Sequence, residues 1–339
     1  MNKRKKLLIL IAKKMLVFFV SIFALSIIAF SMSRIAPGDP LVSYYGDRAE
    51  RMNTEEREHA IHRLGLDGTL TDQYVAWFKG AIKGDFGESF KYKENVLTVI
   101  AGRLVNTLLL GGIGFLLTFF LALLLGILCA LHEGDWLDTL LCKVGTITSC
   151  IPEFWLSLVL ILIFSVTFHL LPSSGAFGLG EADSILSRIR HMILPMVVIV
   201  LSHLWYYAYL IRNKLIDEKR KEYVLMSKSM GLTNRQVMWR HCVRNIMPAF
   251  ISIMAISLNH VLEGTYIVEM VYSYPGIGTL SFESAKYHDY NMLMVLVIIM
   301  GVVVILGNII GQIISENIDH RMKEEAIIED AEVVASEKI

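Results

Sequence analysis

Polar and ionisable side chains interrupt the apolar stretches of this chain at a few positions. One stretch contains Asn259, His260 and Glu263, and in another Glu153 follows a proline. Asn259 and Glu263 are four residues apart and so share one face of a helix. Ionisable groups inside a membrane usually face a partner or a water-filled cavity, so these residues are candidates for the polar wall of a solute path. An interhelical hydrogen-bond network that fixes packing explains Glu263 equally well.

The sequence carries no motif for catalysis or nucleotide binding. It has no G-x-x-x-x-G-K-[ST] phosphate loop, no G-x-S-x-G nucleophile motif and no H-E-x-x-H zinc motif. His59 and His62 lie near each other in sequence, but they lack a further ligand at metal-binding spacing and fit a solvated helix face better. We therefore expect no catalytic residue, no metal and no cofactor on this chain, so any energy source must be a partner.

Hydropathy predicts an all-α transmembrane protein. Hydrophobic residues make up 54% of the 339 residues, and they gather in runs of roughly 20, the length that crosses ~30 Å of hydrocarbon. Six spans account for these runs, at 15–33, 104–131, 144–168, 192–211, 246–271 and 291–314. Pro195 and Pro248 fall in the first turns of the fourth and fifth spans, where a missing N–H is tolerated. Pro152 should kink the third span. The aromatic residues at 205–209 could line a passage, but they fit anchors at the membrane interface better.

The distribution of Lys and Arg predicts the orientation in the membrane. Basic residues at 3–6 place the N-terminus in the cytoplasm, and an even number of spans returns the C-terminus to the same side. Nine of the 32 Lys and Arg residues lie between Arg212 and Arg244, so this loop is expected in the cytoplasm too. The segment 34–103 is placed outside although it holds ten such residues, because long segments cross the membrane largely regardless of charge.

These expectations divide the chain into four parts. Residues 1–33 form the cytoplasmic N-terminus and a retained first span, and residues 34–103 form an extracytoplasmic subdomain. Short helices are expected there, one after Asn53 with Glu56 in a capping box and another from Tyr74 to Ile82. Residues 104–315 form a five-span core that includes a cytoplasmic loop at 212–245. The tail, 316–339, is cytoplasmic, and its acidic end is expected to be disordered.

The basic loop contains the pattern of a helical hairpin. A helical pattern stops at Gly231 and resumes after Thr233 and Asn234. This predicts a short helix, a turn and a second helix, with Gly231 either at positive φ or in close contact with a partner. A helical hairpin that extends from a membrane domain into the cytosol is suited to docking on another protein.

The residues of this hairpin resemble the EAA loop of ABC importer permeases, in the version of the peptide/nickel family. The resemblance implies contact with ATPase subunits through Glu222, Tyr223, Ser227, Ser229, Gly231, Leu232, His241, Arg244 and Asn245. Ser227 and Ser229 stand where the family usually has Ala, and they keep the small volume. Pro248 also matches the family pattern.

Further segments resemble the same family and cover nearly the whole chain. The PGDP piece at 37–40 and the GDFG-S piece at 84–89 resemble the external scoop of the B-type subunit of a permease pair. EMVYSYPGIG at 269–278 resembles the motif E-x-V-F-x-x-P-G-x-G, with Tyr272 in place of Phe. Residues 317–321 resemble the closing D-P-R, with His320 in place of Pro. The motif at 269–278 implies a structural role at the external mouth of the pore, and the residues with this role would be Glu269, Pro275, Gly276 and Gly278.

The resemblance implies a type I ABC importer permease fold with six spans, in the inner membrane of a bacterium. The implied partners are a homologous second permease, two ABC ATPases that hold ATP and Mg²⁺, an extracytoplasmic binding protein and the lipid bilayer, but no nucleic acid. Peptide is the expected cargo, and nickel, metal chelates or small glycosides are alternatives.

Two hypotheses from other classes compete with the importer. An ion-coupled secondary transporter would need a paired inverted repeat, which the sequence lacks. A membrane receptor that docks a kinase or another output domain would also use the basic loop, and co-purification with an ATPase would distinguish it from an importer.

Overall fold

The computed structural model describes residues 3–36 and 39–318, with side chains for 12, 14–36, 39–257, 264–311 and 313. The described residues form helices and turns, with an isolated bridge between Glu88 and Asn95. The predicted all-helical class is therefore confirmed for this part of the chain. It divides into two compact units, one made of 1–107 and 275–306 and the other of 108–274 and 307–339.

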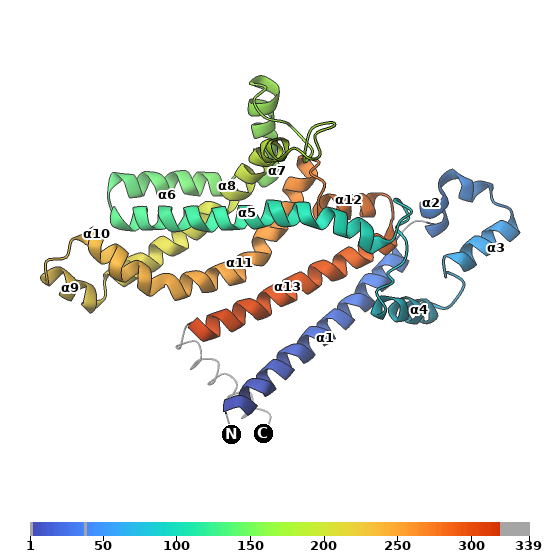
Figure 1. Cartoon of the computed structure of the whole chain (residues 1–339), viewed down its shortest axis with the longest axis horizontal. Helices are drawn as coiled ribbons and strands as arrows, with labels where there is room; N and C mark the ends of the chain where they lie inside the picture. Colours follow the sequence, from blue (N-terminus) through green and yellow to red (C-terminus); the bar gives the residue numbers. More distant parts are fainter. Residues whose placement is uncertain (1–2, 37–38, 319–339) are drawn as a thin grey trace. The chain divides into compact units, whose positions relative to one another are not determined.

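The first unit is built around two long helices that lie side by side, α1 and α13 (Figure 1). Its elements are α1 (Lys3–Ile35), α2 (Pro40–Tyr45), the 3-10 helix η1 (Gly46–Arg51), α3 (Thr54–Arg63), α4 (Leu70–Ile82), the start of α5 (Val96–Leu131), α12 (Ile277–Lys286) and most of α13 (Tyr290–Ile318). Phe30 of α1 packs against Met294 and Ile298 of α13 in a buried cluster. Gly301 allows the close approach, because a Cβ there would collide with Leu25.

The short helices after α1 begin where side chains satisfy their free N–H groups. The Asn53 side chain accepts from Glu56 N at 2.8 Å, and Glu56 returns a bond to Asn53 N, so the predicted capping box is confirmed. α4 begins earlier than the predicted Tyr74, because Thr69 and Asp72 form a second capping box. Tyr74 then bonds Ser26 of α1 at 2.9 Å, which ties α4 to the long helix.

The second unit contains the helices on which the basic loop is mounted. Its elements are the rest of α5, α6 (Trp136–Ser149), α7 (Glu153–Leu160), the π-helical turn η2 (Ile161–Thr167), α8 (Ile185–Lys219), α9 (Glu222–Ser229), α10 (Asn234–Val237), the π-helical turn η3 (Met238–Cys242) and α11 (Val243–Val271). The rings of Phe119 in α5 and Tyr207 in α8 pack in a tilted arrangement with centroids 4.4 Å apart. Phe250 of α11 meets the same phenylalanine at 6.0 Å, so α5, α8 and α11 share one core.

Pro152 does more than kink the predicted third span. The helix α6 stops at Ser149, and α7 starts at Glu153 with Pro152 as its N-cap. The two helices are bent by 98° at this break. A proline lacks the N–H that would bond back to the preceding turn, and its ring clashes with that turn. The predicted kink at Pro152 is therefore present, and it is sharp enough to separate two helices.

The other two membrane prolines also lie elsewhere in their helices than predicted. α8 begins at Ile185, where the Ser184 hydroxyl accepts from Ser187 N at 3.2 Å, so Pro195 is buried well inside the helix. Pro248 lies inside α11, which begins at Val243 directly after η3. Both prolines were predicted in the first turn of a helix. That prediction is wrong because each helix begins with polar residues that the sequence analysis assigned to a loop.

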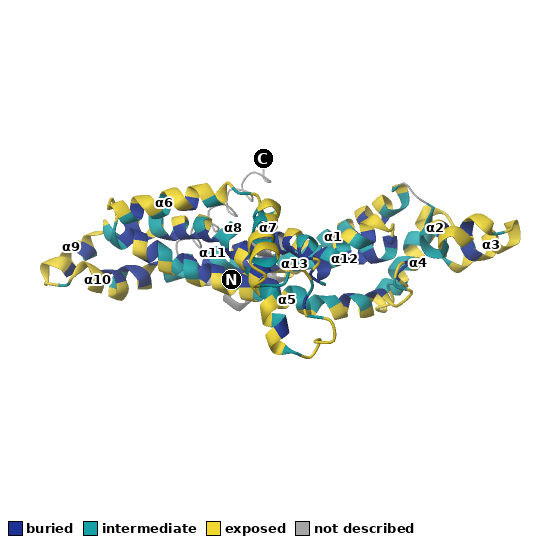
Figure 2. Cartoon of the chain, turned by 90° about the horizontal axis from the view of Figure 1, so that it is seen from above, coloured by how far each residue is buried: buried dark blue, intermediate teal, exposed yellow. Residues whose placement is uncertain are grey.

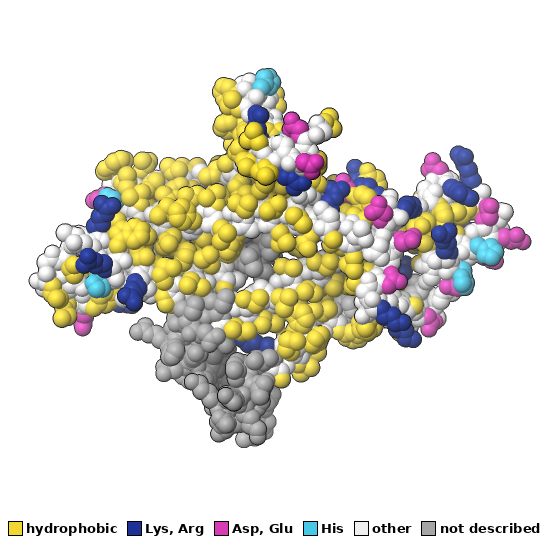
Figure 3. Space-filling view, viewed as in Figure 1, with side chains coloured by type: hydrophobic (Ala, Val, Ile, Leu, Met, Phe, Trp, Pro, Cys, Tyr) yellow, Lys and Arg dark blue, Asp and Glu magenta, His cyan; other side chains and the backbone are white. Residues whose placement is uncertain are grey.

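The described residues contain four helices that are long and apolar enough to cross a membrane, namely α1, α5, α8 and α13. The bent pair formed by α6 with α7 and η2 would supply a fifth. The predicted fifth span coincides with α11, where the side chains of 258–263 fall outside the described residues. Hydrophobic side chains cover the long helices (Figure 3), as expected of surfaces in contact with lipid.

The contact between α6 and α8 can be tested at Gly145. A Cβ at this position would lie 2.5 Å from Trp205 Cε3, so Gly145→Ala should overpack the contact and destabilise the protein by about 1–3 kcal/mol. Gly112→Ala is the matched control, because nothing lies within 4 Å of a Cβ there and alanine favours a helix. Thermal unfolding of the purified protein in detergent measures both. Equal melting temperatures for the two variants would contradict the packing.

Candidate functional site

The predicted helical hairpin is present at one end of the second unit (Figure 1). α9 ends at Ser229, and Gly231 follows with φ of +87°, so the predicted positive φ is confirmed. Gly231 N donates to Lys228 O at 2.9 Å and closes the helix end. Thr233 then caps α10 in a capping box with Gln236. The turn therefore follows from local sequence signals.

The nine residues predicted to contact an ATPase do not share one environment (Figure 2). The exposed ones are Glu222, Ser229, Gly231, Arg244 and Asn245, the half-buried ones are Tyr223, Leu232 and His241, and Ser227 is buried. Buried Ser227 is satisfied locally, because its hydroxyl donates to Tyr223 O at 2.7 Å. This internal bond explains how Ser can stand where the family usually has Ala.

Large apolar side chains project from the same hairpin into solvent. Leu225 and Met226 of α9 are 63% and 67% exposed, and Met230 in the turn is 73% exposed. Sequence reasoning did not single out these three residues, although their spacing on a short helix is visible. They form an apolar tip, which we define as Leu225, Met226 and Met230.

A buried carboxylate that sequence reasoning missed holds the inner side of the hairpin. Glu218, near the end of α8, is 7% exposed. Its Oε1 accepts from the Tyr223 hydroxyl at 2.8 Å and from Asn245 Nδ2 at 3.2 Å. Its Oε2 lies 2.5 Å from Lys221 Nζ. Tyr223 and Asn245, predicted as ATPase contacts, therefore both bond to Glu218.

Three further ion pairs attach the base of the hairpin to the α5–α6 corner. Asp138 of α6 is buried and receives both Arg212 Nε at 2.7 Å and Arg212 Nη2 at 2.5 Å. Glu133 pairs with Lys219 at 2.8 Å and with Arg220 at 3.4 Å. The hydrogen bond from Lys219 holds the pKa of the Glu133 carboxyl below its usual value. The partners are far apart in sequence, so no local pattern indicates them.

Cys129 and Cys142 lie beside the Asp138–Arg212 pair. Their sulfur atoms and a carboxylate oxygen of Asp138 are all within 4.8 Å of one another. Arg212 already bonds both oxygens of Asp138, and its positive charge disfavours a cation at this place. The cluster is better explained as the buried end of the α6–α8 contact.

Among the predicted path residues, only Glu153 has a described side chain. Glu153 Oε1 lies 3.9 Å from His203 Nδ1 of α8, and a Cβ on Gly264 of α11 would come within 2.7 Å of His203 Cε1. α11 therefore approaches this pair closely. The side chains of Asn259, His260 and Glu263 fall outside the described residues.

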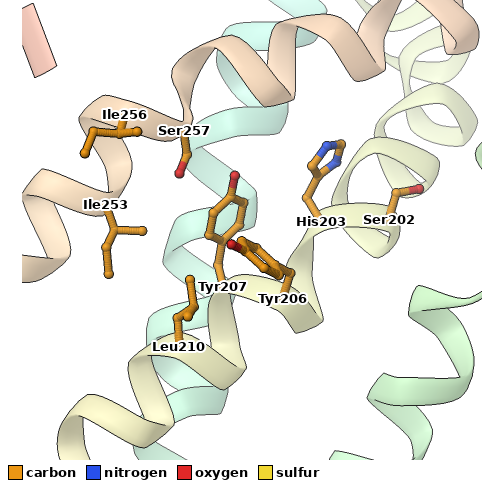
Figure 4. A pocket seen from close by; sticks show the side chains of 8 residues that line it. All are labelled: Ser202, His203, Tyr206, Tyr207, Leu210, Ile253, Ile256 and Ser257. Atoms are coloured by element: carbon orange, nitrogen blue, oxygen red, sulfur yellow. The ribbon is translucent and has the colours of Figure 1, made fainter. Parts of the chain in front are cut away.

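His203 also borders a cavity of about 450 Å³ between α8 and α11 (Figure 4). The lining residues are Ser202, His203, Tyr206, Tyr207, Leu210, Ile253, Ile256 and Ser257. Hydroxyl groups and an imidazole thus share the wall with aliphatic side chains. Tyr206 and Tyr207, interpreted from sequence as interfacial anchors, both line this cavity.

The predicted mouth motif is divided between the two units. Glu269 is fully buried in α11 of the second unit, and its carbonyl oxygen accepts from Tyr274 N at 2.8 Å. Pro275, Gly276 and Gly278 belong to the first unit. There Pro275 O accepts from Asn106 Nδ2 at 2.8 Å, and Gly276 is the N-cap of α12.

Comparison with known proteins identifies a family. The family described as binding-protein-dependent transport system inner membrane component matches residues 122–324, and its N-terminal counterpart matches residues 7–111. The oligopeptide transport system permease protein AppB of Bacillus subtilis is 29% identical over 89% of this chain and 95% of its own length. The di/tripeptide transport system permease protein DppB of Pseudomonas aeruginosa is 28% identical over 90% of this chain and 95% of its own.

The similarity extends to a metal-transport relative and to a solved fold. The metal-staphylopine import system permease protein CntB of Staphylococcus aureus is 25% identical over 93% of this chain and 98% of its own. A chain of the MetNI methionine ABC transporter, in an inward-facing conformation, superposes with a TM-score of 0.54 at 16% identity. The match covers 66% of this chain and 97% of that one. The chain therefore belongs to the binding-protein-dependent transport system inner membrane components, the permease subunits of ABC importers.

Proposed function

We propose that this chain is the B-type member of a permease heterodimer that imports peptides. A binding protein outside the membrane would deliver the cargo, and two cytoplasmic ABC ATPases would supply energy. The names of the AppB and DppB relatives support peptide as cargo. The name of CntB supports import of a metal chelate as the alternative, and nickel or small glycosides fit the same architecture.

The observation that carries the proposal is the apolar tip of the hairpin. Three large apolar side chains exposed to water on a polar, basic loop are unfavourable unless a partner covers them. An ATPase surface with an apolar groove and acidic rim would bury them beside the basic residues Lys228 and Arg235. The chain has no phosphate-binding loop, so ATP and Mg²⁺ belong to the partner subunits.

In the proposed mechanism, ATP binding closes the ATPase dimer and pulls the hairpins of the two permeases together. Force would pass from α9 into α8 and α11 and tilt them, which opens the cavity outward to accept cargo. ATP hydrolysis and ADP release would reverse the tilt. Asn259, His260, Glu263 and Glu153 are the proposed polar wall of the path. Glu269, Pro275, Gly276 and Gly278 are the proposed supports of its external mouth.

The same proposal includes six spans with both termini in the cytoplasm. The bent α6–α7 pair and α11 would provide the two spans beyond the four long apolar helices. Residues 34–103 would form the extracytoplasmic subdomain, 104–315 the five-span core and 316–339 the cytoplasmic tail.

Docking through the apolar tip can be tested at Met226. Met226→Asp would place a charge in an apolar contact, so we expect the affinity for the ATPase subunits to fall at least about tenfold. Leu70→Asp is the control, because Leu70 is 61% exposed but lies in the proposed external subdomain. Co-purification and binding titration with the cognate ATPases measure the effect. Unchanged affinity of the Met226 variant would contradict docking at this tip.

Orientation can be tested with single cysteines at two exposed positions, Asp67 and Asn234. The background should lack the four native cysteines. In intact cells, an impermeant maleimide should label position 67 and not position 234, because only the first is proposed to lie outside. Permeabilised cells provide the control for reactivity at both. Equal labelling of the two positions in intact cells would be incompatible with the topology.

The turn of the hairpin can be tested at Gly231. A Cβ there meets nothing within 4 Å, but φ is +87°, so the strain of a substitution is conformational. Gly231→Val should strain the turn by roughly 1–2 kcal/mol and uncouple ATP hydrolysis from transport. Gly231→Asn is the matched control, since Asn tolerates positive φ. Transport by the assembled complex should fall in the order glycine, asparagine, valine. Parental transport by the valine variant would exclude a coupling role.

A further inference from the structure

Glu218 receives hydrogen bonds from both ends of the hairpin segment. Tyr223 lies at the start of α9, and Asn245 lies in the first turn of α11, beyond the second helix of the hairpin. Both donate to the same oxygen, Oε1, while Lys221 approaches the other oxygen. One carboxylate at the end of α8 thus joins the two ends of the hairpin to each other and to α8.

These contacts involve a charged group that has little access to water. Glu218 is 7% exposed, and a buried carboxylate is stable only when its oxygens are satisfied. Hydrogen bonds to an ionised group are roughly twice as strong as neutral ones, so three such contacts make a stiff junction. Removing the charge would weaken all three contacts together.

Further contacts show that Tyr223 belongs to the interior side of the junction. Burial and then the hydrogen bond to Glu218 raise the pKa of the Tyr223 phenol above its usual value. Its backbone carbonyl accepts from Ser227, and its ring lies 6.2 Å from the ring of His241. Ser227 and His241, two further residues predicted as ATPase contacts, thus both lie against Tyr223.

The turn between α8 and α9 is fixed from its other side as well. Glu133 pairs with Lys219 and Arg220, and Lys219 Nζ also donates to Ala130 O at 2.7 Å. The start of the turn is therefore attached to the α5–α6 corner. Among the described side chains, only Glu218 makes charged hydrogen bonds that attach the hairpin itself to α8.

We propose that Glu218 is the positioning residue of energy coupling, holding the hairpin at a fixed angle on α8 so that displacement of α9 moves α8 and α11. The inference rests on the proposed function, in which an ATPase pushes or pulls the hairpin. Without the junction, only apolar packing, such as that of Val224 in the cluster that contains Leu215 of α8, would hold α9 in place, and more of its displacement would be lost in local motion. ATP would then be hydrolysed without a matching movement of the membrane helices.

The test uses the whole importer, with the second permease, the ATPases and the binding protein, in proteoliposomes supplied with a tripeptide. Glu218→Gln keeps the shape of the side chain and removes its charge. We expect the complex to assemble and hydrolyse ATP, while the ratio of ATP hydrolysed to tripeptide imported rises about tenfold, the effect of losing a charged hydrogen bond. Asp217→Asn is the matched control, because Asp217 is the exposed neighbour on the same turn of α8.

A reciprocal exchange separates positioning from general stability. Asn245→Asp alone puts two carboxylates together. It should raise the ratio of ATP hydrolysed to tripeptide imported above that of the Glu218→Gln variant. The double variant with Glu218→Gln and Asn245→Asp returns one amide and one carboxylate to the junction, and should bring the ratio to within about twofold of the parent. A role in stability alone would change complex yield and melting temperature but leave the ratio near the parental value.

The outcomes against the proposal are distinct from failure of the proposed function. An unchanged ratio in an assembled Glu218→Gln complex overturns the proposal, and so does a raised ratio that the double variant does not lower. If Glu218→Gln fails to assemble, Tyr223→Phe decides, because it removes a single donor and keeps the ring; a parental ratio then overturns the proposal. A parental complex that neither binds ATPases nor imports tripeptide would instead refute the proposed function.

Discussion

Every backbone N–H and C=O inside a hydrocarbon layer must find a partner within the protein, and this constraint governs the rest of the chain. It explains why the described residues of the long apolar segments form helices. It also limits where a helix can be interrupted. The 98° break at Pro152 leaves backbone groups of Cys150 and Ile151 outside a regular helix. The N–H groups of both residues are nevertheless paired, because Cys150 N donates to Ile147 O at 3.2 Å and Ile151 N donates to Thr148 O at 3.1 Å.

A charged side chain is costly inside hydrocarbon, and the ion pairs near the helix ends fix the geometry of the basic loop. Asp138 with Arg212 joins α6 to α8, and Glu133 with Lys219 joins the α5–α6 corner to the end of α8. A buried carboxylate that meets a guanidinium through two hydrogen bonds has little freedom to shift. The hairpin therefore stands on a rigid base, and a force applied to it can move whole helices rather than loosen a loop.

Local signals in the sequence predicted local structure well. The capping box at Asn53 and the positive φ of Gly231 depend on a few consecutive residues, and both are confirmed. Features that depend on distant partners were missed or misplaced. Pro195 was assigned to a first turn because the polar residues from 187 to 191 look like loop, yet they continue α8. Glu218 was overlooked because its meaning comes from Tyr223 and Asn245, which the fold brings to it.

The first helix of the hairpin has two faces that the sequence motif does not distinguish. In α9 the helical period turns residues 223, 224 and 227 toward the core and residues 222, 225, 226 and 229 toward solvent. A helix of eight residues is marginal by itself in water, so its exposed face can meet a partner only if its inner face is anchored. Tyr223 and Ser227 supply that anchor, and Leu225 and Met226 are the proposed contact surface. A substitution on the inner face should therefore disturb transmission of force, whereas one on the outer face should disturb binding. In the proposed function, the two faces of α9 would therefore serve different steps of transport.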